Sequence, residues 1–268
     1  MKRIIAMMLA LMMVFALCAC GNNTSNDDKQ KADDSVKTLT VGVDPEYPPY
    51  AYMGDDGKYT GFDVEVAQAV CDLEGWTLDK KPINWDSKDM ELNSGSIDCI
   101  WNGFTITDER KENLEFSRPY IENKQVVVIK KSNADKYTDT KSLSGANLVA
   151  ETSSAGEDAI ADDENLSKAS YTAVGKQTDG LLEVKAGTAD AVILDYTLAD
   201  AMVGEGTDFS DLCMIDGLDL CVEEYGVGFR SGSDLAAKFN EFYKAAYADG
   251  TVMEIANQYG VQESVIAK

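Results

Sequence analysis

One arginine lies where it could hold an anion. Arg110 falls in the first turn of a helix that we expect to begin near Thr107, and Thr105 lies five residues before it. A guanidinium group can bind a carboxylate through two parallel hydrogen bonds, and the free N–H groups of a helix start attract the same negative group. Arg110 and Thr105 therefore form a candidate carboxylate site, and an exposed surface charge is the alternative for the arginine.

A second cluster of hydrogen-bond donors lies in a loop further along the chain. The loop Thr152–Gly156 joins an expected strand at Asn147–Glu151 to the next helix. Its backbone N–H groups and the Ser154 hydroxyl can bind an anion, and Ser153 or Ser154 can equally cap the helix. The two roles are compatible.

A carboxylate stands at the end of an apolar strand. Asp195 directly follows Ala191–Leu194, and open α/β sheets bind ligands at the carboxyl ends of their strands. An aspartate after a strand is also a common helix cap. Taken alone, Asp195 fits a ligand contact and a cap equally well.

The elements that must position these groups alternate between strand and helix. Short β-rich runs are separated by segments with apolar residues at helical spacing, which favours parallel sheets with helices on their faces. A capping box over Thr60–Asp63 and a stop at Gly75 bound the first helix. We expect strands over 39–43, 97–101, 147–151 and 189–194, helices beginning near 62, 108, 156, 179 and 197, and closing helices over 234–249 and 252–259.

Two extended, exposed-looking runs flank the middle of the chain. Gln125–Lys130 and Leu220–Gly228 bracket a set of strands and helices that would form a sheet of its own. We therefore predict two lobes joined by a two-strand hinge. The first lobe would contain residues 39–127 and 224–268, and the second lobe residues 128–223.

The first twenty residues have the pattern of an export signal. Lys2 and Arg3 precede an apolar stretch that is short for a membrane-spanning helix. The following Leu17-Cys18-Ala19-Cys20 resembles the bacterial lipobox, whose last cysteine is acylated after cleavage. We expect a signal peptide over 1–19, a lipidated Cys20, and a flexible polar tether over 20–38. The mature protein would then be extracytoplasmic, on the outer face of the cell membrane; an ordinary signal peptide and a retained membrane anchor are the alternatives.

The composition excludes several classes of function. The sequence has no histidine, which removes Ser-His-Asp triads, Cys-His pairs and most zinc sites. Its formal net charge of −23 repels nucleic acids. We expect no cofactor, no metal, no catalytic residue and no nucleic-acid partner.

Four cysteines follow the tether, and they allow three disulfide pairings. We expect free buried thiols, because Cys71 falls on an apolar helical face and Cys99 in an apolar strand. Cys213 with Cys221 is the first candidate if a bridge forms.

Four sequence blocks follow one another in a specific order and spacing. They are Val41–Tyr50, Gly61–Val64, Asn102–Arg110 and Phe116–Tyr120. Together they resemble the polar-amino-acid family of extracytoplasmic solute-binding proteins, the receptors of ABC importers. The resemblance covers nearly everything after the tether. It implies an α/β, two-lobed periplasmic-binding-protein-like fold of type II, with two helix-flanked sheets joined by two strands.

The resemblance also assigns roles to residues of a cleft between the lobes. Arg110 and Thr105 match the pair that clasps the carboxylate of the ligand, and Asp195 matches the partner of its α-ammonium group. Gly103 stands where some members have serine, so backbone contact alone is expected there. Ser154 is expected to serve the carboxylate together with backbone amides.

Aromatic and acidic residues complete the implied site. Trp85 matches a position that packs against the aliphatic part of the ligand; Tyr47, Tyr50 and Phe104 are further wall candidates, with core packing as the alternative for each. By family position, Asp44 and Glu151 point toward the ligand side chain. Two carboxylates there favour a cationic tip, such as that of arginine, lysine or ornithine.

The implied function is that of a receptor. The protein would bind a free amino acid, close around it and dock on the permease subunits of an ABC importer, as a monomer attached to the membrane through Cys20. One alternative is an enzyme of the cyclohexadienyl dehydratase type, with Asp195 or Glu151 as general acid. A second alternative is a sensor module that presents the ligand to a signalling receptor.

Overall fold

The structure is a computed structural model that describes residues 38–267. The predicted signal peptide, the lipidation site Cys20 and the predicted tether up to residue 37 lie outside the described residues. Thr38, which we placed at the end of the tether, begins the first strand. Among the described helices, none combines the length and the apolar character that crossing a membrane requires.

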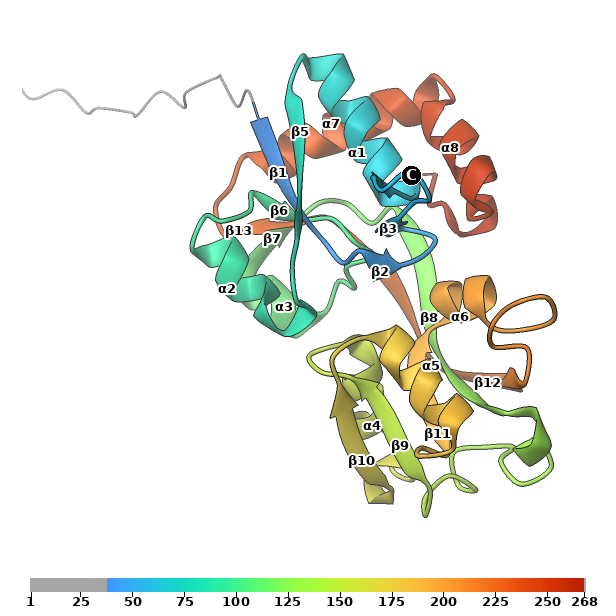
Figure 1. Ribbon diagram of the computed structural model, residues 1–268. Coiled ribbons are helices and arrows are strands. Elements are labelled where there is room, and N and C mark those ends of the chain that lie inside the picture. The colour runs from blue at the N-terminus through green and yellow to red at the C-terminus, as the bar shows by residue number, and fades with distance from the viewer. Residues whose placement is uncertain (1–37, 268) are drawn as a thin grey trace, which may run out of the picture. The chain divides into compact units, whose positions relative to one another are not determined.

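The first lobe is built on a five-stranded sheet in the order β5-β1-β6-β13-β7 (Figure 1). Strands β5 and β6 run parallel to β1, whereas β13 is antiparallel to both β6 and β7. The strands are β1 (Thr38–Val43), β5 (Thr77–Pro82), β6 (Cys99–Ile100), β7 (Leu114–Phe116) and β13 (Gly228–Arg230). The strand expected over 97–101 is therefore shorter than predicted.

Helices cover this sheet, and the two closing helices pack against the first one. The helices of the first lobe are α1 (Phe62–Glu74), α2 (Lys88–Asn93), α3 (Asp108–Asn113), α7 (Leu235–Ala248) and α8 (Thr251–Tyr259). A small antiparallel sheet adds β2 (Glu46–Tyr47), β3 (Ala51–Met53) and β4 (Tyr59–Thr60).

The start of α1 differs from the prediction. Its N-cap is Gly61 at φ 126°, without a side-chain cap, and the Thr60 hydroxyl instead donates to Glu65 at 3.2 Å. A Cβ on Gly61 would lie 2.3 Å from the carbonyl oxygen of Tyr50, so close packing of two backbones replaces the predicted capping box. The predicted stop is confirmed, because Gly75 closes the helix in the left-handed conformation.

The second lobe is built on another five-stranded sheet, in the order β10-β9-β11-β8-β12. Strands β10, β9 and β11 are mutually parallel, and β8 is antiparallel to both of its neighbours. The strands are β8 (Ile121–Lys130), β9 (Asn147–Glu151), β10 (Ser170–Val174), β11 (Ala191–Asp195) and β12 (Leu212–Tyr225). The helices are α4 (Ala155–Asp162), α5 (Gln177–Ala186) and α6 (Tyr196–Met202).

Strands β8 and β12 run from one sheet toward the other. Their near ends meet first-lobe residues, since Tyr225 bridges to Thr105 and Ile121 bridges to Val265. The part of β8 that we described as exposed-looking is buried over Val126–Ile129, because β8 lies between β11 and β12 inside the sheet. The chain therefore passes twice between the two sheets, along one antiparallel pair of strands.

The four cysteines of the described chain form no disulfide. Cys71 and Cys99 are buried, as expected for thiols that pack as small apolar groups. Cys213 is half-buried and Cys221 is exposed, so the prediction of a buried thiol is wrong for Cys221.

Candidate functional site

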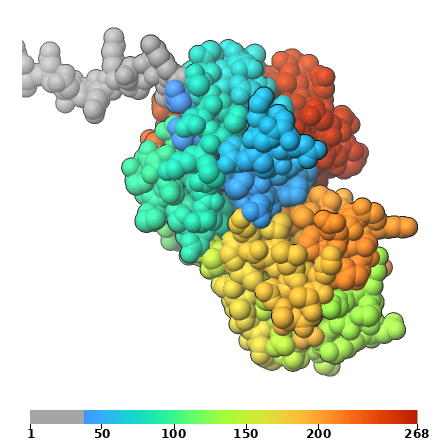
Figure 2. Space-filling view, viewed as in Figure 1, coloured from blue at the N-terminus to red at the C-terminus, as the bar shows by residue number. Residues whose placement is uncertain are grey.

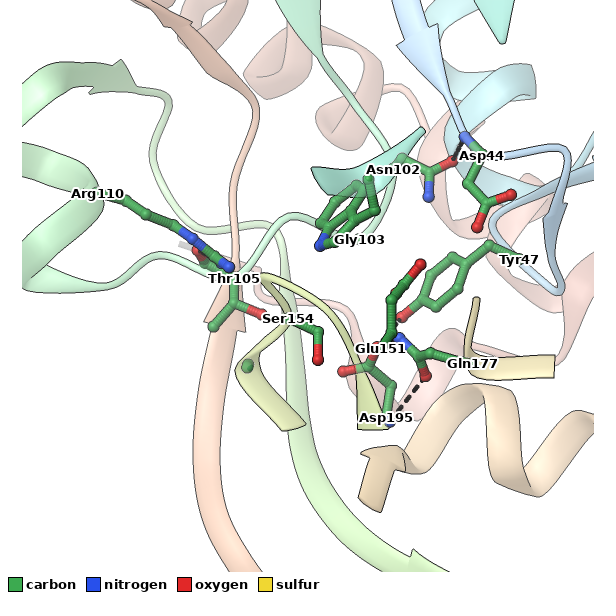
Figure 3. A pocket seen from close by; sticks show the side chains of 12 residues that line it. Asp44, Tyr47, Asn102, Gly103, Thr105, Arg110, Glu151, Ser154, Gln177 and Asp195 are labelled. Atoms are coloured by element: carbon green, nitrogen blue, oxygen red, sulfur yellow. Dashed lines mark hydrogen bonds between the residues drawn. The ribbon is translucent and has the colours of Figure 1, made fainter. Parts of the chain in front are cut away.

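A narrow pocket lies between residues of the two sheets (Figure 3). The space between its walls measures about 300 Å³ when the open mouth is included. Only about 10 Å³ of this space is wide enough for the centre of a water molecule. This room suffices for about one water, so an amino acid can enter only if the walls move apart. The lining residues are Asp44, Tyr47, Trp85, Asn102, Gly103, Thr105, Arg110, Glu151, Ser154, Ala155, Gln177 and Asp195.

The Arg110 guanidinium lies at one end of this pocket. Its Nη1 donates to the carbonyl oxygen of Thr105 at 2.7 Å, and its Nη2 donates across the lobes to that of Ser153 at 3.2 Å. The group stacks on the Phe104 ring, 4.7 Å from its centroid, and burial lowers the pKa of the arginine. Thr107 caps α3 by accepting the N–H of Arg110 at 3.1 Å. The arginine is thus held in place as a donor, rather than lying free on the surface.

The predicted aromatic residues form two layers. Trp85 and Tyr47 line the pocket, whereas Phe104 and Tyr50 are fully buried behind them. Phe104 meets Trp85 edge to face with centroids 5.6 Å apart, and Tyr50 stacks on Tyr47 at 5.6 Å. The inner pair therefore supports the wall without reaching the pocket.

Gly103 turns the loop that follows β6 toward the pocket. It adopts φ 55°, and a Cβ would lie 2.7 Å from Cε1 of Tyr47. Its N–H donates to Asp63 at 2.8 Å, and the Tyr120 hydroxyl donates to the same carboxylate oxygen at 2.8 Å. The backbone contact that we expected from Gly103 is thus already used by Asp63. Burial raises the pKa of Asp63 to about 7.

Asp195 receives four hydrogen bonds. Its Oδ1 accepts from Asn123 at 2.9 Å and from Gln125 at 2.6 Å, both on β8. Its Oδ2 accepts from the Tyr47 hydroxyl of the first lobe at 2.8 Å and from the Gln177 amide of α5. Its own N–H donates to the side-chain carbonyl of Gln177 at 3.1 Å. Asp195 occupies the N-cap position of α6, but its side chain accepts no backbone N–H of that helix. The carboxylate is therefore fixed by donors rather than used as a cap.

A second carboxylate stands behind Asp195. Glu223 on β12 accepts from the same two amides, Asn123 at 2.6 Å and Gln125 at 2.9 Å. Burial and the neighbouring Asp195 charge raise the pKa of Glu223. Both strands that connect the lobes thus contribute to holding Asp195.

The opposite end of the pocket is acidic. Asp44 follows β1, and Glu151 ends β9; both are buried. The Asp44 carboxylate accepts the N–H of Glu46 at 2.9 Å, whereas Oε1 of Glu151 has no hydrogen-bond partner among the described residues. Burial, followed by the charges of Asp44 and Asp195, raises the pKa of Glu151 to about 9. Burial also raises the pKa of Asp44.

Lys88 is a buried cation that the sequence interpretation missed. It is 3% exposed, and its ammonium group donates to the carbonyl oxygens of Trp85 and Ser153, each at 3.1 Å. Burial and the nearby Arg110 charge lower the pKa of Lys88 to about 8. Two first-lobe cations therefore share the Ser153 carbonyl of the second lobe.

The loop before α4 uses its serines for local structure. Ser154 caps the helix by accepting the N–H of Glu157 at 3.2 Å, as the capping interpretation predicted, while still lining the pocket. Ser153 adopts φ 58°, and its N–H donates to Glu157 at 2.6 Å. At the acidic end, Lys176 of the second lobe pairs with Glu46 of the first. In the space-filling view, the blue first-lobe segment around Glu46 lies directly against yellow second-lobe residues (Figure 2).

The residues that the sequence interpretation predicted thus meet in one place, apart from Phe104 and Tyr50 in the second layer. A cation at one end, acceptors in the middle and two acids at the other end suit a molecule with a carboxylate, an ammonium group and a polar tail. The residues missed were Asp63, Lys88, Asn102, Asn123, Gln125, Gln177 and Glu223. Of these, Asp63 and Asn102 lie inside the blocks already singled out and could have been found there.

The comparison with protein families decides the identity of this fold. The model of the bacterial extracellular solute-binding proteins, family 3, matches residues 39–262. The chain belongs to this family. The predicted family, the type II fold class and the function class of a solute-binding receptor are therefore confirmed.

Individual relatives agree. The chain is 29% identical to the L-cystine-binding protein TcyJ of Escherichia coli over 223 residues, covering 83% of this chain and 82% of TcyJ. It is 26% identical to the arginine-binding extracellular protein ArtP of Bacillus subtilis, covering 97% of this chain and 98% of ArtP. An ABC uptake transporter substrate-binding protein from Streptococcus pneumoniae with bound histidine is 33% identical, with a TM-score of 0.76, covering 87% of this chain and 95% of the other. These relatives are solute-binding proteins.

Proposed function

We propose that this chain is a lipid-anchored receptor that captures a polar amino acid with a cationic side chain and delivers it unchanged to an ABC importer. The observation that carries the proposal is the order of charges along the pocket, with Arg110 at one end, Asp195 in the middle and Asp44 with Glu151 at the other end. Relatives named for cystine, arginine and histidine support an amino-acid ligand.

The ligand carboxylate would bind at the Arg110 end. Its two oxygens can take over the guanidinium donors that now reach the Thr105 and Ser153 carbonyls, and the Ser154 hydroxyl lines the same end. A charged acceptor forms stronger hydrogen bonds with arginine than a neutral carbonyl does, which favours this exchange.

The ligand ammonium group would bind Asp195. Oδ2 of this residue is the better candidate, because its present donors are the Tyr47 hydroxyl and the Gln177 amide, which come from outside the connecting strands. Oδ1 is held from behind by Asn123 and Gln125 and stays oriented when the other oxygen changes partner.

The ligand side chain would pass Trp85 and Tyr47 toward Asp44 and Glu151. Once ionised, these two buried carboxyl groups can pair with an ammonium or guanidinium tip, whereas a neutral tip offers them no countercharge. This end of the pocket therefore favours a basic amino acid.

Binding requires the lobes to open and close. Hydrogen bonds from Tyr47, Lys88 and Arg110 to second-lobe oxygens, and the ion pair of Glu46 with Lys176, now join the two sides. Bending of β8 and β12 would part these contacts and admit the ligand, and closure would then exclude water and strengthen each polar contact. The closed form is the one that we expect to dock on the permease, as a monomer.

A thermal-shift screen tests the ligand proposal. The purified protein is melted with each of the twenty amino acids, ornithine, cystine and prephenate, because a ligand of the native state raises the melting temperature. A shift with a basic amino acid supports the proposal. A shift with cystine or glutamine alone would contradict the cationic side chain, and a response to prephenate alone would favour an enzyme.

The anchor is tested separately. Cells that carry the wild-type chain or Cys20→Ser are labelled with palmitate and fractionated. We expect label and membrane association for the wild type only. Equal membrane association of the Cys20→Ser variant would show that the protein is held at the membrane by other means.

A further inference from the structure

Glu151 is the most deeply placed acid of the pocket. It ends β9 and is 3% exposed, and its Oε1 is buried without a hydrogen-bond partner among the described residues. In the close-up view its carboxyl group lies among Tyr47, Gln177 and Asp195, on the side that faces Asp44 (Figure 3). A polar atom in this position points at the space that a ligand must fill.

The charged and amide groups that act on the Glu151 carboxyl group come from four elements. Asp44 follows β1, Asp195 ends β11, Lys88 begins α2 and Gln177 begins α5. Lys88 is the cation with the largest effect on Glu151, and its ammonium group is already bonded to two carbonyl oxygens. Lys176, at the same end of the pocket, is paired with Glu46. Two acids and one engaged lysine leave the Glu151 charge uncompensated.

A buried carboxyl group with this surplus of negative neighbours keeps its proton. The pKa of Glu151, raised to about 9 by burial and then by Asp44 and Asp195, agrees with this reading of the geometry. Without ligand, the group is therefore neutral near pH 7.

We propose that a basic ligand binds by exchange, its positive side-chain tip replacing the proton on the Glu151 carboxyl group. The O–H bond of Glu151 breaks, the proton leaves to solvent, and the carboxylate pairs with the ammonium or guanidinium group of the ligand. The buried charge of the pocket then stays constant during binding. This inference rests on the proposed function, and it identifies Glu151 as the residue that distinguishes a charged from a neutral ligand side chain.

The exchange makes selectivity depend on pH. A neutral amino acid leaves the proton on Glu151 and can use it for one hydrogen bond, so its affinity stays flat with pH. A basic amino acid must expel the proton, so its affinity rises with pH by about tenfold per unit wherever Glu151 is protonated before binding and ionised after it. Acid therefore weakens the binding of basic ligands alone.

Isothermal titration with arginine measures this directly. Heats recorded at one pH in phosphate and in Tris differ by the ionisation heats of the buffers, and this difference gives the number of protons released. We expect close to one proton per arginine and about a tenfold gain in affinity per pH unit from roughly pH 6 to 7.5. Lys88, whose pKa is lowered to about 8, stays mostly protonated across this window.

Two variants test whether the released proton comes from Glu151. Glu151→Gln keeps the shape of the neutral acid, and we expect it to bind arginine at least tenfold more weakly at pH 7.5, with no proton release and a flat pH profile. Glu122→Gln changes an exposed acid on β8 and should keep the wild-type slope. If Glu151→Gln fails to fold, the two-buffer measurement on the wild-type protein still tests the release.

The outcomes separate the two proposals. Arginine, lysine or ornithine binding without proton release, or with the same slope in Glu151→Gln, would overturn the exchange and leave the amino-acid receptor intact. Binding of neutral amino acids only would also overturn the exchange. Failure of every amino acid to bind would remove the proposed function itself, and the exchange with it.

Discussion

Replacing Asp195 by asparagine probes the centre of the pocket with the smallest possible change. The carboxylate accepts two hydrogen bonds at each oxygen, from four different side chains. Asparagine offers one carbonyl oxygen and one NH₂ group, so either orientation turns an NH₂ group toward two donors. The better orientation directs the NH₂ group at Tyr47 and Gln177, because the tyrosine hydroxyl can rotate and accept.

The expected loss of stability follows from this count. One buried donor remains without an acceptor, which costs about 1–3 kcal/mol. For a body of this size, each kcal/mol lowers Tm by roughly 2–4 °C. We therefore expect Asp195→Asn to melt roughly 2–12 °C below the wild type.

The expected loss of affinity is larger. Removing the charged partner of a buried ammonium group costs about 2–5 kcal/mol. This corresponds to a Kd that rises from roughly 30-fold to several thousandfold. Titration calorimetry with the amino acid that gives the largest thermal shift measures it.

Asp190→Asn is the matched control for Asp195→Asn. Asp190 also accepts two hydrogen bonds in the second lobe, from the Tyr137 hydroxyl at 2.8 Å and from the N–H of Asn147 at 2.9 Å, but it lies outside the pocket. This variant should lose stability and keep its affinity. An Asp195→Asn protein that binds within threefold of the wild type, or an Asp190→Asn protein that loses affinity equally, would refute the assigned ammonium contact.

Three further changes test the surroundings of the pocket. Gly103→Ala forces a Cβ into a positive φ and against Tyr47, so we expect roughly 2 kcal/mol of lost stability and a lower Tm; an unchanged Tm would contradict the close approach. Asp63 binds its proton more tightly in the folded than in the unfolded protein, so its contribution to stability falls as pH rises from roughly 4 to 7. The Tm of Asp63→Asn should therefore rise relative to that of the wild type between pH 5 and pH 8. A Tm difference that stays constant over this range would refute the raised pKa of Asp63. Lys176→Ala removes a partly exposed ion pair with Glu46 between the lobes and should change stability by at most about 1 kcal/mol in chemical denaturation; a larger loss would mean that this pair governs closure.

The candidate site was predictable where local sequence and site coincide. Arg110 lies one turn from a capped helix start, and Asp195 ends an apolar strand; both features are visible within a few residues. Glu151 was placed at its strand end for the same reason. Local patterns of this kind specify which end of an element a side chain occupies, and sheet topology then brings the strand ends together.

Other members of the site carry no local signal. Lys88 begins a short helix in a polar stretch and reads as an exposed lysine, yet it is buried because the Ser153 carbonyl of the other lobe approaches its ammonium group. Asn123 and Gln125 lie two residues apart on β8, a spacing that is common for polar residues on one face of a strand. They contact Asp195 and Glu223 only because β11 and β12 pair with β8 on either side.

The sequence by itself determined the alternation of strands and helices, the two crossings of the chain and the chemical types at the strand ends, because these depend on residue spacing over short ranges. The tertiary structure alone decided which charges face one another. Burial and the approach of distant carboxylates leave Glu151 protonated and Asp195 surrounded by donors, although both are acids at the ends of strands in one sheet. Solvation and long-range charge depend on contacts between segments far apart in the chain, and no local pattern records them.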